Sequence, residues 1–255
     1  MRHHRISLSP LSLLAALMIG VVITSCSKRG ELLDSVPADV KMVATVNVEK
    51  LCEDAGIKFT PDGGIEVVPQ LQSHMSDDMR NLPARLSKLK ASGAVDLTDA
   101  VMGVDAANET FITLAINDSK ALREATAGYL TWSDDASGYS VAQEDNTSFV
   151  ANDTQMWIMG GSTGYVVKQV EEMLKGAKEL AVSKLDGIAQ VMARDNLINV
   201  AVPSGSFLFL PSGNDNAEVA PQEQTWSVLS LNVGADNALV AEAEMMKATG
   251  VTIVP

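Results

Sequence analysis

The chain has 255 residues, 46% of them hydrophobic, and a formal net charge of −13. A chain this acidic repels nucleic acid, so we expect no nucleic-acid partner. With only three histidines and two cysteines it lacks the ligands of an imidazole or thiolate zinc site, and we expect no metal and no other cofactor.

The first 25 residues have the layout of a secretory signal peptide. Arg2 and Arg5 precede a 13-residue apolar stretch from Leu11 to Ile23. As a helix this stretch would rise about 20 Å, which is too short for a hydrocarbon core of about 30 Å. We therefore expect residues 1–25 to be removed, which changes the net charge from −13 to −15 because two arginines are lost.

A cysteine directly follows this segment, in the sequence Ile23-Thr24-Ser25-Cys26. The pattern of a branched apolar residue, two small residues and a cysteine resembles the lipobox of bacterial lipoproteins. This resemblance implies a diacylglycerol on the Cys26 thiol, cleavage between Ser25 and Cys26, and acylation of the new amine. Two or more acyl chains hold a protein firmly at a membrane, so the membrane is the partner expected through Cys26.

The residues after the cysteine bear on location. Ser27 stands where many lipoproteins retained in the inner membrane carry aspartate, so the resemblance implies the outer membrane. Surface-exported lipoproteins of the Bacteroidota type carry acidic residues here, whereas Lys28 and Arg29 are basic. The resemblance therefore favours the periplasmic face.

Hydrophobic patterning divides the rest of the chain. Residues 26–36 are expected to form a lipidated tether, and residues 37–255 an α+β domain, either undivided or built as two subdomains. Alternating apolar residues predict a strand over 42–48, followed by a short helix. Apolar residues spaced by three and four predict a long helix from Pro69 to Ala91, interrupted at Pro83.

The segment "SVPADVKMVATVNVEKLCEDAGI" resembles the opening of a broad set of uncharacterised lipoproteins of the Bacteroidota type. These proteins have a proline–acid turn soon after the lipid cysteine, then a valine-rich strand and a leucine-bearing helix. The resemblance carries no active site. The matching residues are Pro37, Ala38, Asp39, Val43, Val46, Val48 and Leu51.

The second half of the chain is predicted to be rich in strands. Three segments, "SGYSVAQ", "TSFVA" and "TQMWIM", form an expected antiparallel meander, with Asn152-Asp153 as a hairpin loop. Residues 203–224 are predicted as a long loop, and "TWSVLSLNV" and "ALVAEAEMM" as a final hairpin. The fold class expected is α+β, a mainly antiparallel sheet with helices packed on one face; a parallel α/β sheet is the alternative.

Few residues of the mature chain suit nucleophilic or acid–base catalysis, and no catalytic residue is assigned. His74 would be the only histidine left, and it is expected on an exposed helix face. Cys52 lies among acidic residues that raise a thiol pKa, so we interpret it as a small packed residue. The carboxylates between Asp134 and Asp153 leave a carboxylate-dependent hydrolase as an alternative. The neighbouring acidic pairs are Asp134 and Asp135, Glu144 and Asp145, and Glu171 and Glu172.

Two further features bear on possible binding sites. "GGSTG" from Gly160 to Gly164 lacks the residues of a phosphate-binding loop and is interpreted as a turn with a helix cap from Ser162 or Thr163. Among the tryptophans, Trp157 is expected in the core, while exposed Trp132 and Trp226 beside one groove would indicate nutrient capture.

Ser35 lies in Asp34-Ser35-Val36, which resembles the Asp-Ser/Thr-apolar pattern of periplasmic O-glycosylation in the same bacteria. Ser35 is therefore a hypothetical glycosylation site. Taken together, these observations predict a lipid-anchored protein of the cell envelope with a binding or structural domain rather than an enzyme. The sequence does not define its protein or glycan partner. A carboxylate-dependent hydrolase and a nutrient-capture accessory lipoprotein remain the alternatives.

Overall fold

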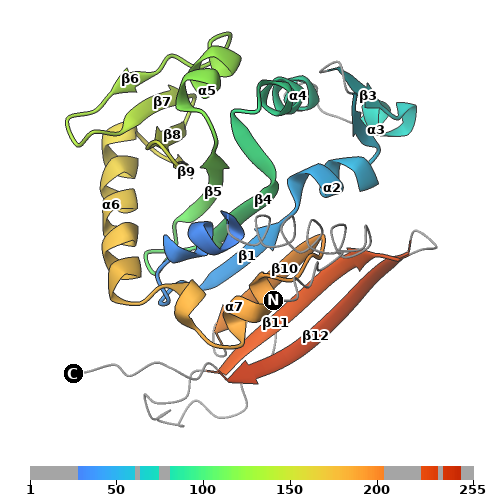
Figure 1. Ribbon diagram of the computed structural model, residues 1–255, viewed down its shortest axis with the longest axis vertical. Helices are drawn as coiled ribbons and strands as arrows, with labels where there is room; N and C mark the ends of the chain where they lie inside the picture. The colour runs from blue at the N-terminus through green and yellow to red at the C-terminus, as the bar shows by residue number, and fades with distance from the viewer. Residues whose placement is uncertain (1–27, 61–63, 75–80, 204–224, 235–237, 248–255) are drawn as a thin grey trace, which may run out of the picture.

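The fold is built around one large antiparallel sheet. The computed structural model describes residues 28–60, 64–74, 81–203, 225–234 and 238–247 (Figure 1). Ten strands form the sheet in the order β12-β11-β10-β1-β4-β5-β9-β8-β7-β6, and every neighbouring pair is antiparallel. The strands are β1 (Met42–Val46), β4 (Val95–Val104), β5 (Thr110–Ile116), β6 (Ser133–Asp134), β7 (Ser140–Glu144), β8 (Thr147–Ala151), β9 (Gln155–Gly160), β10 (Ile198–Pro203), β11 (Thr225–Val233) and β12 (Leu239–Lys247).

Helices and a small hairpin connect these strands. The hairpin pairs β2 (Ile57–Phe59) with β3 (Ile65–Val67). None of the helices in the described ranges is long and apolar enough to cross a membrane. The helices are α2 (Val48–Asp54), α3 (Pro69–His74), α4 (Leu82–Ser92), α5 (Ser119–Thr126), α6 (Thr163–Glu179), the 3-10 helix η1 (Val182–Lys184) and α7 (Ile188–Met192).

Local chemistry explains where several helices begin. Asn47 caps α2, and its side-chain oxygen accepts a hydrogen bond from the Lys50 backbone N–H. Asp118 caps α5 in the same way. Gly161 has φ 113°, which glycine adopts without strain, and this turn leads from β9 into α6.

Two hydrophobic clusters lie on opposite faces of the sheet. The larger cluster contains odd-numbered β1 and β4 residues such as Val43 and Val101, packed against α6, η1 and α7. The smaller one contains their even-numbered neighbours, such as Val46 and Ala100, packed against α4 and α5. Side chains alternate between the faces of a strand, so these are the two sides of one sheet. We call them the first face and the second face.

The expected α+β class and mainly antiparallel sheet are therefore confirmed, but helices cover both faces rather than one. The large sheet is continuous, with no division into two separate sheets. The predicted meander is present as β7, β8 and β9, and the final hairpin as β11 and β12. The predicted helix over 69–91 is described only as α3 and α4, and Pro83 lies in the first turn of α4, where its missing N–H is not needed. Most of the predicted loop, residues 204–224, lies outside the described residues.

The predicted tether over residues 26–36 requires a correction. Residues 28–34 are helical, and Leu32, Leu33 and Val36 are buried in the larger cluster. After this helix Pro37 forms a β-bridge with Ala181, beside the end of α6. The apolar residues are spaced so that one helical face enters the core, and burial of that face fixes the segment. Residues 28–36 are therefore part of the folded domain rather than a tether.

Candidate functional site

The carboxylates considered for hydrolysis do not face each other. Asp134 is paired with Arg123, and Glu144 accepts two hydrogen bonds from Arg85 at 2.7 and 2.8 Å. Asp134 is the register partner of Ser140 at one end of β7, and Glu144 lies at the other end. Four residue steps along a strand span about 13 Å, beyond the roughly 5–9.5 Å of glycosidase carboxyl pairs. The hydrogen bond and charge of Arg123 lower the pKa of Asp134, the opposite of what a general acid needs.

The other acidic candidates have structural positions. Asp135 accepts a hydrogen bond from the Ser137 backbone N–H in a turn, and Asp145 adopts a positive φ of 52° between β7 and β8. Glu171 and Glu172 are exposed on α6. Within the described ranges no group of three or more acidic, histidine or cysteine side chains is arranged to hold a metal ion.

The tryptophans do not line a common groove. Trp226 is fully buried in the larger cluster, whereas Trp132 packs against the smaller cluster on the opposite face. The indole N–H of Trp132 donates to Thr126 Oγ1 at 2.8 Å. The pair that would have indicated nutrient capture is therefore not formed. Trp157 is buried in the core, as predicted.

Three candidates remain: Cys52, the glycine segment and His74. Cys52 is buried, and burial together with Glu49 and Glu53 raises its thiol pKa, which opposes reactivity. The glycine segment forms a turn into α6, but the predicted side-chain cap is not made: Ser162 is at the N-cap position without a side-chain hydrogen bond to the helix. His74 ends α3, and its side chain lies outside the described residues.

The structure argues against glycosylation of Ser35. Its side chain is only 5% exposed, because residue 35 directly follows the N-terminal helix and faces the sheet. The Ser35 hydroxyl donates to the Leu32 carbonyl at 2.7 Å and accepts from the Gln155 amide at 2.6 Å. A glycan at this oxygen would displace Gln155 and could not fit within the fold.

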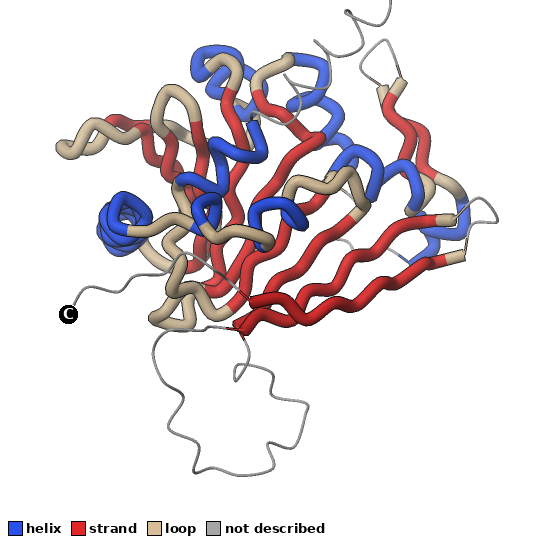
Figure 2. The backbone as a smooth tube through the Cα atoms, turned by 60° about the horizontal axis from the view of Figure 1, so that its bottom comes forward, coloured by secondary structure: helices blue, strands red, loops and turns tan. Residues whose placement is uncertain are grey.

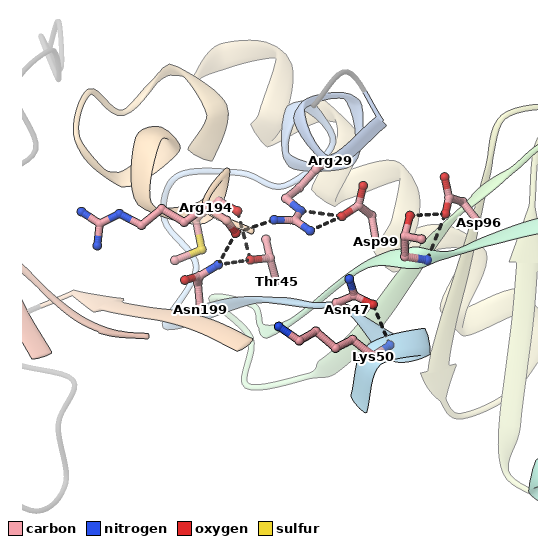
Figure 3. A network of polar contacts seen from close by, with 10 residues as sticks. Arg29, Thr45, Asn47, Lys50, Asp96, Asp99, Arg194 and Asn199 are labelled. Carbon is pink, nitrogen blue, oxygen red and sulfur yellow. Dashed lines mark hydrogen bonds and ion pairs between the residues drawn. The ribbon is translucent and has the colours of Figure 1, made fainter. Parts of the chain in front are cut away.

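A buried ion pair fixes the N-terminal helix to the sheet (Figure 3). Arg29 donates to Asp99 through Nε at 2.5 Å and also through a terminal nitrogen. Its other terminal nitrogen donates to the Arg194 carbonyl at 2.6 Å. The β4–β5 register shifts between Val95 and Ala100, and Asp99 lies within this irregularity. A bulge re-aims side chains, which explains how the Asp99 carboxylate on β4 faces the N-terminal helix.

Polar contacts extend from this pair to the final strands. The Arg194 carbonyl also accepts from Asn199 Nδ2 at 3.0 Å, and Asn199 Oδ1 accepts from Ser230 on β11 at 2.9 Å. The Arg194 side chain donates to Glu244 on β12 at 2.5 Å. Residue 194 thus links the N-terminal helix to both strands of the final hairpin.

Burial raises the pKa of the Asp99 carboxyl above its ordinary value, and Arg29 opposes this rise by charge and hydrogen bonding. The Arg29 and Asp99 side chains are 9% and 2% exposed, so water screens the pair little. The three guanidinium nitrogens of Arg29 are directed at Asp99 Oδ1 and at the Arg194 carbonyl. The geometry therefore supports a structural role rather than a catalytic one.

The second candidate surface is the far end of the sheet, at the hairpin of β11 and β12. The nine residues of β12 pair with β11 along the whole strand, and α7 contacts β10 and β11 on the first face. Figure 2 shows the hairpin strands extending past the helices at the edge of the sheet. The predicted alternation of apolar residues with Glu242 and Glu244 is present in β12, but the apolar residues Leu239 and Met245 are 65% and 75% exposed.

A cavity of about 160 Å³ lies at this hairpin, lined by polar side chains and by Val233 and Val240. Its polar side chains are Asn196, Ser230, Asn232 and Glu242, and backbone near Gly234 completes it. The Asn232 amide oxygen already accepts from Lys50 Nζ at 2.8 Å, and the Asn196 amide and the Ser230 hydroxyl donate to Asn199. The group of this cavity that suits a cation is therefore the Glu242 carboxylate. Sequence reasoning missed both this surface and the Arg29–Asp99 pair. The available signals were the apolar spacing of Leu32, Leu33 and Val36 and the apolar row of β12.

Comparisons with known proteins do not identify a family. No family model matches the chain, and no curated protein matches it. Among solved structures, crystal form IV of TP0453 matches with a TM-score of 0.48 and 10% identity, covering 84% of this chain and 79% of that one. Crystal form III gives a TM-score of 0.46 and 10% identity, with 87% and 81% covered. Crystal form I gives 0.39 and 12%, with 85% and 93% covered. At these TM-scores no functional conclusion follows.

Proposed function

We propose that this protein is a lipid-anchored lipoprotein of the cell envelope whose folded domain binds a partner without catalysing a reaction. The anchor is Cys26, acylated after cleavage between Ser25 and Cys26. The lipobox pattern and the signal-peptide layout of residues 1–25 support it. The resemblance of the segment from Pro37 to Leu51 to Bacteroidota-type lipoproteins is a further support.

The observation that carries the proposal is that the chain is already folded two residues after Cys26. Residues 28–34 are helical, and Arg29 is held by Asp99 in the interior. Two residue steps separate the Cα atoms of Cys26 and Lys28 by at most about 7 Å. An acylated Cys26 would hold the domain close to the bilayer surface rather than at the end of a long flexible linker.

We further propose the periplasmic face of the outer membrane as the location. Ser27 in place of aspartate supports the outer membrane, as in the lipoproteins that the segment resembles. The absence of an acidic run after Cys26 supports the periplasmic face. In the fold, Lys28 pairs with Asp96 at 3.4 Å and Arg29 with Asp99, so both basic residues also have structural partners.

A binding role is preferred to the alternatives because neither has a site in the described ranges. Asp134 and Glu144 are held apart in separate ion pairs, which disfavours a carboxylate-dependent hydrolase there. Trp132 and Trp226 lie on opposite faces of the sheet, which disfavours nutrient capture between them. The exposed edge and cavity at β12 remain as the surface available to a partner.

Labelling and mass measurement test the anchor. Cells grown with labelled palmitate should incorporate label into the wild-type protein and into Cys52→Ala, the matched control with the other cysteine removed. Cys26→Ala should lose the label. The mass of the wild-type product should show loss of residues 1–25 and gain of acyl groups. Label retained in Cys26→Ala, or an uncleaved wild-type chain, would exclude the proposal. Protection from protease in intact cells tests the periplasmic face.

A further inference from the structure

The two edges of the sheet differ in a way that matters for binding. At one edge β6 has only two residues, Ser133 and Asp134, which leaves little backbone to pair with. At the other edge β12 has nine residues, and no described strand pairs with its outer side. Natural proteins block exposed edges with short strands, proline, bulges or inward charges. β12 contains no proline, and its register with β11 is continuous.

The hydrogen-bond phase of the hairpin shows which backbone groups face outward. The Gly234 N–H donates to the Ala238 carbonyl at 2.8 Å. Hydrogen-bonded and non-hydrogen-bonded pairs alternate along an antiparallel ladder. The even-numbered residues of β12 therefore bond to β11. The odd-numbered residues, including Ala241 and Ala243, direct their N–H and C=O groups to the open edge.

Side chains of β12 divide into two rows of different chemistry. On the second face the odd-numbered residues form an exposed apolar row: Leu239, Ala241, Ala243 and Met245. On the first face Glu242 and Glu244 lie between Val240 and Met246. Glu242 also lines the cavity, and Glu244 is paired with Arg194. Directly opposed residues of paired strands share a face. A strand added at this edge would thus place one row of side chains beside apolar groups and the other beside carboxylates.

Charge disfavours the fully overlapping pairing of β12 with a second copy. In this two-fold pairing about Ala243, the central residue of β12, Glu242 of each copy would lie opposite Glu244 of the other. Like charges directly opposed in a sheet are destabilising. A strand with lysine or arginine at alternate positions has the complementary charge, and the Glu242 carboxylate in the cavity offers its cationic ends an oxygen acceptor.

We propose that β12 is a strand-addition site for an extended segment of a partner protein in which basic residues alternate with apolar ones. The segment pairs with the outward backbone groups of the odd-numbered residues. Its apolar side chains lie beside Leu239 and Met245, and its basic side chains lie on the face of Glu242, because Glu244 is already paired with Arg194. Main-chain hydrogen bonds supply affinity, and the alternating rows supply specificity. This site supplies the binding surface that the proposed function requires, and it does not depend on acylation of Cys26.

The probe is a fluorescent nonapeptide of alternating valine and lysine, added to the mature full-length protein in detergent and followed by fluorescence anisotropy. An alternating valine–glutamate nonapeptide is the matched control. We expect saturable binding of the lysine peptide and none of the glutamate peptide over the same range. Glu242→Gln should weaken lysine-peptide binding about two- to fivefold, the range expected for one exposed ion pair. Raised salt should weaken it too.

Backbone pairing is tested at Ala243, whose N–H faces outward. Ala243→Pro removes this donor while leaving the β11 ladder intact, and should weaken peptide binding about fivefold or more. Ala243→Val keeps the donor and should bind within about twofold of wild type; circular dichroism melts check that both variants fold. Equal binding of the two peptides, no binding of either, or no effect of Ala243→Pro would overturn the proposal. So would association of the chain with itself through β12 in sedimentation experiments without peptide binding.

Discussion

Replacing Arg29 by methionine tests whether the N-terminal helix is part of the folded domain. The change keeps an apolar stem but leaves Asp99, 2% exposed, without its cationic partner, and it leaves the Arg194 carbonyl without a donor from this helix. Breaking a buried ion pair by removing one partner costs about 3–5 kcal/mol. For a domain of this size each kcal/mol shifts the melting temperature by about 2–4 °C, so a decrease of about 6–20 °C is expected at pH 7.

The pH dependence separates this explanation from loss of packing. Burial already raises the pKa of Asp99, and removing Arg29 raises it further because the opposing charge is gone. A group with a raised folded pKa stabilises the fold when protonated and loses that contribution as pH rises through the folded pKa. The deficit of Arg29→Met relative to wild type should therefore be full at neutral pH and shrink as pH falls toward the carboxyl range.

Calorimetry of both proteins between pH 7 and pH 4 measures this difference. Lys184→Met is the control, because its pair with Asp34 is 68% and 52% exposed and such pairs contribute at most about 1 kcal/mol. If Arg29→Met melts within a degree or two of wild type at pH 7, the segment behaves as a tether and the reasoning is refuted. A deficit that does not change with pH would assign the loss to packing instead of charge.

Three further measurements check other parts of the structure. Ser35→Ala removes a buried hydroxyl with two partners and should lower the free energy of unfolding by about 1–3 kcal/mol, and the mass of the wild-type protein should show no glycan there. Gly103→Ala should destabilise by about 1–3 kcal/mol, because a Cβ would press against the Met42 carbonyl oxygen and lie 2.8 Å from the Phe111 ring. Unfolding by denaturant measures this loss. Arg194 lowers the pKa of Glu244, so their ion pair is present above the ordinary carboxyl pKa and is lost as pH falls through the lowered value; NMR titration should show an upward shift of this pKa in Arg194→Met.

The sequence predicted the strands better than the way they are covered. Alternation in "MVATV" and in the last two strands identified β1, β11 and β12, because a period of two is a property of the strand itself. Which row of an alternating strand is covered depends on the helices that arrive from elsewhere in the chain. In β12 the apolar row is the more exposed one, and only the register with β11 and β10 shows this.

The N-terminal segment was mispredicted for a related reason. Residues 26–36 were predicted as a tether, and Arg29 was considered only in relation to sorting. The residue that neutralises Arg29 is Asp99, 70 positions away on a β-bulge, and local sequence gives no indication of that contact. The apolar spacing of Leu32, Leu33 and Val36 was the available signal. It is short, however, and isolated helices of this length are not stable without tertiary contacts.

The polar contacts of Arg194 connect the two proposed parts of the function. Its carbonyl accepts from Arg29, next to the proposed anchor, and its side chain donates to Glu244 on the proposed binding strand. A domain on a long flexible linker samples a volume that grows with linker length, which lowers its effective concentration near a fixed target. Here the proposed anchor is two residues from a helix that is tied through Arg194 to β12. A segment bound at β12 would therefore be held near the bilayer, which favours a partner that is itself at the membrane over one that diffuses freely.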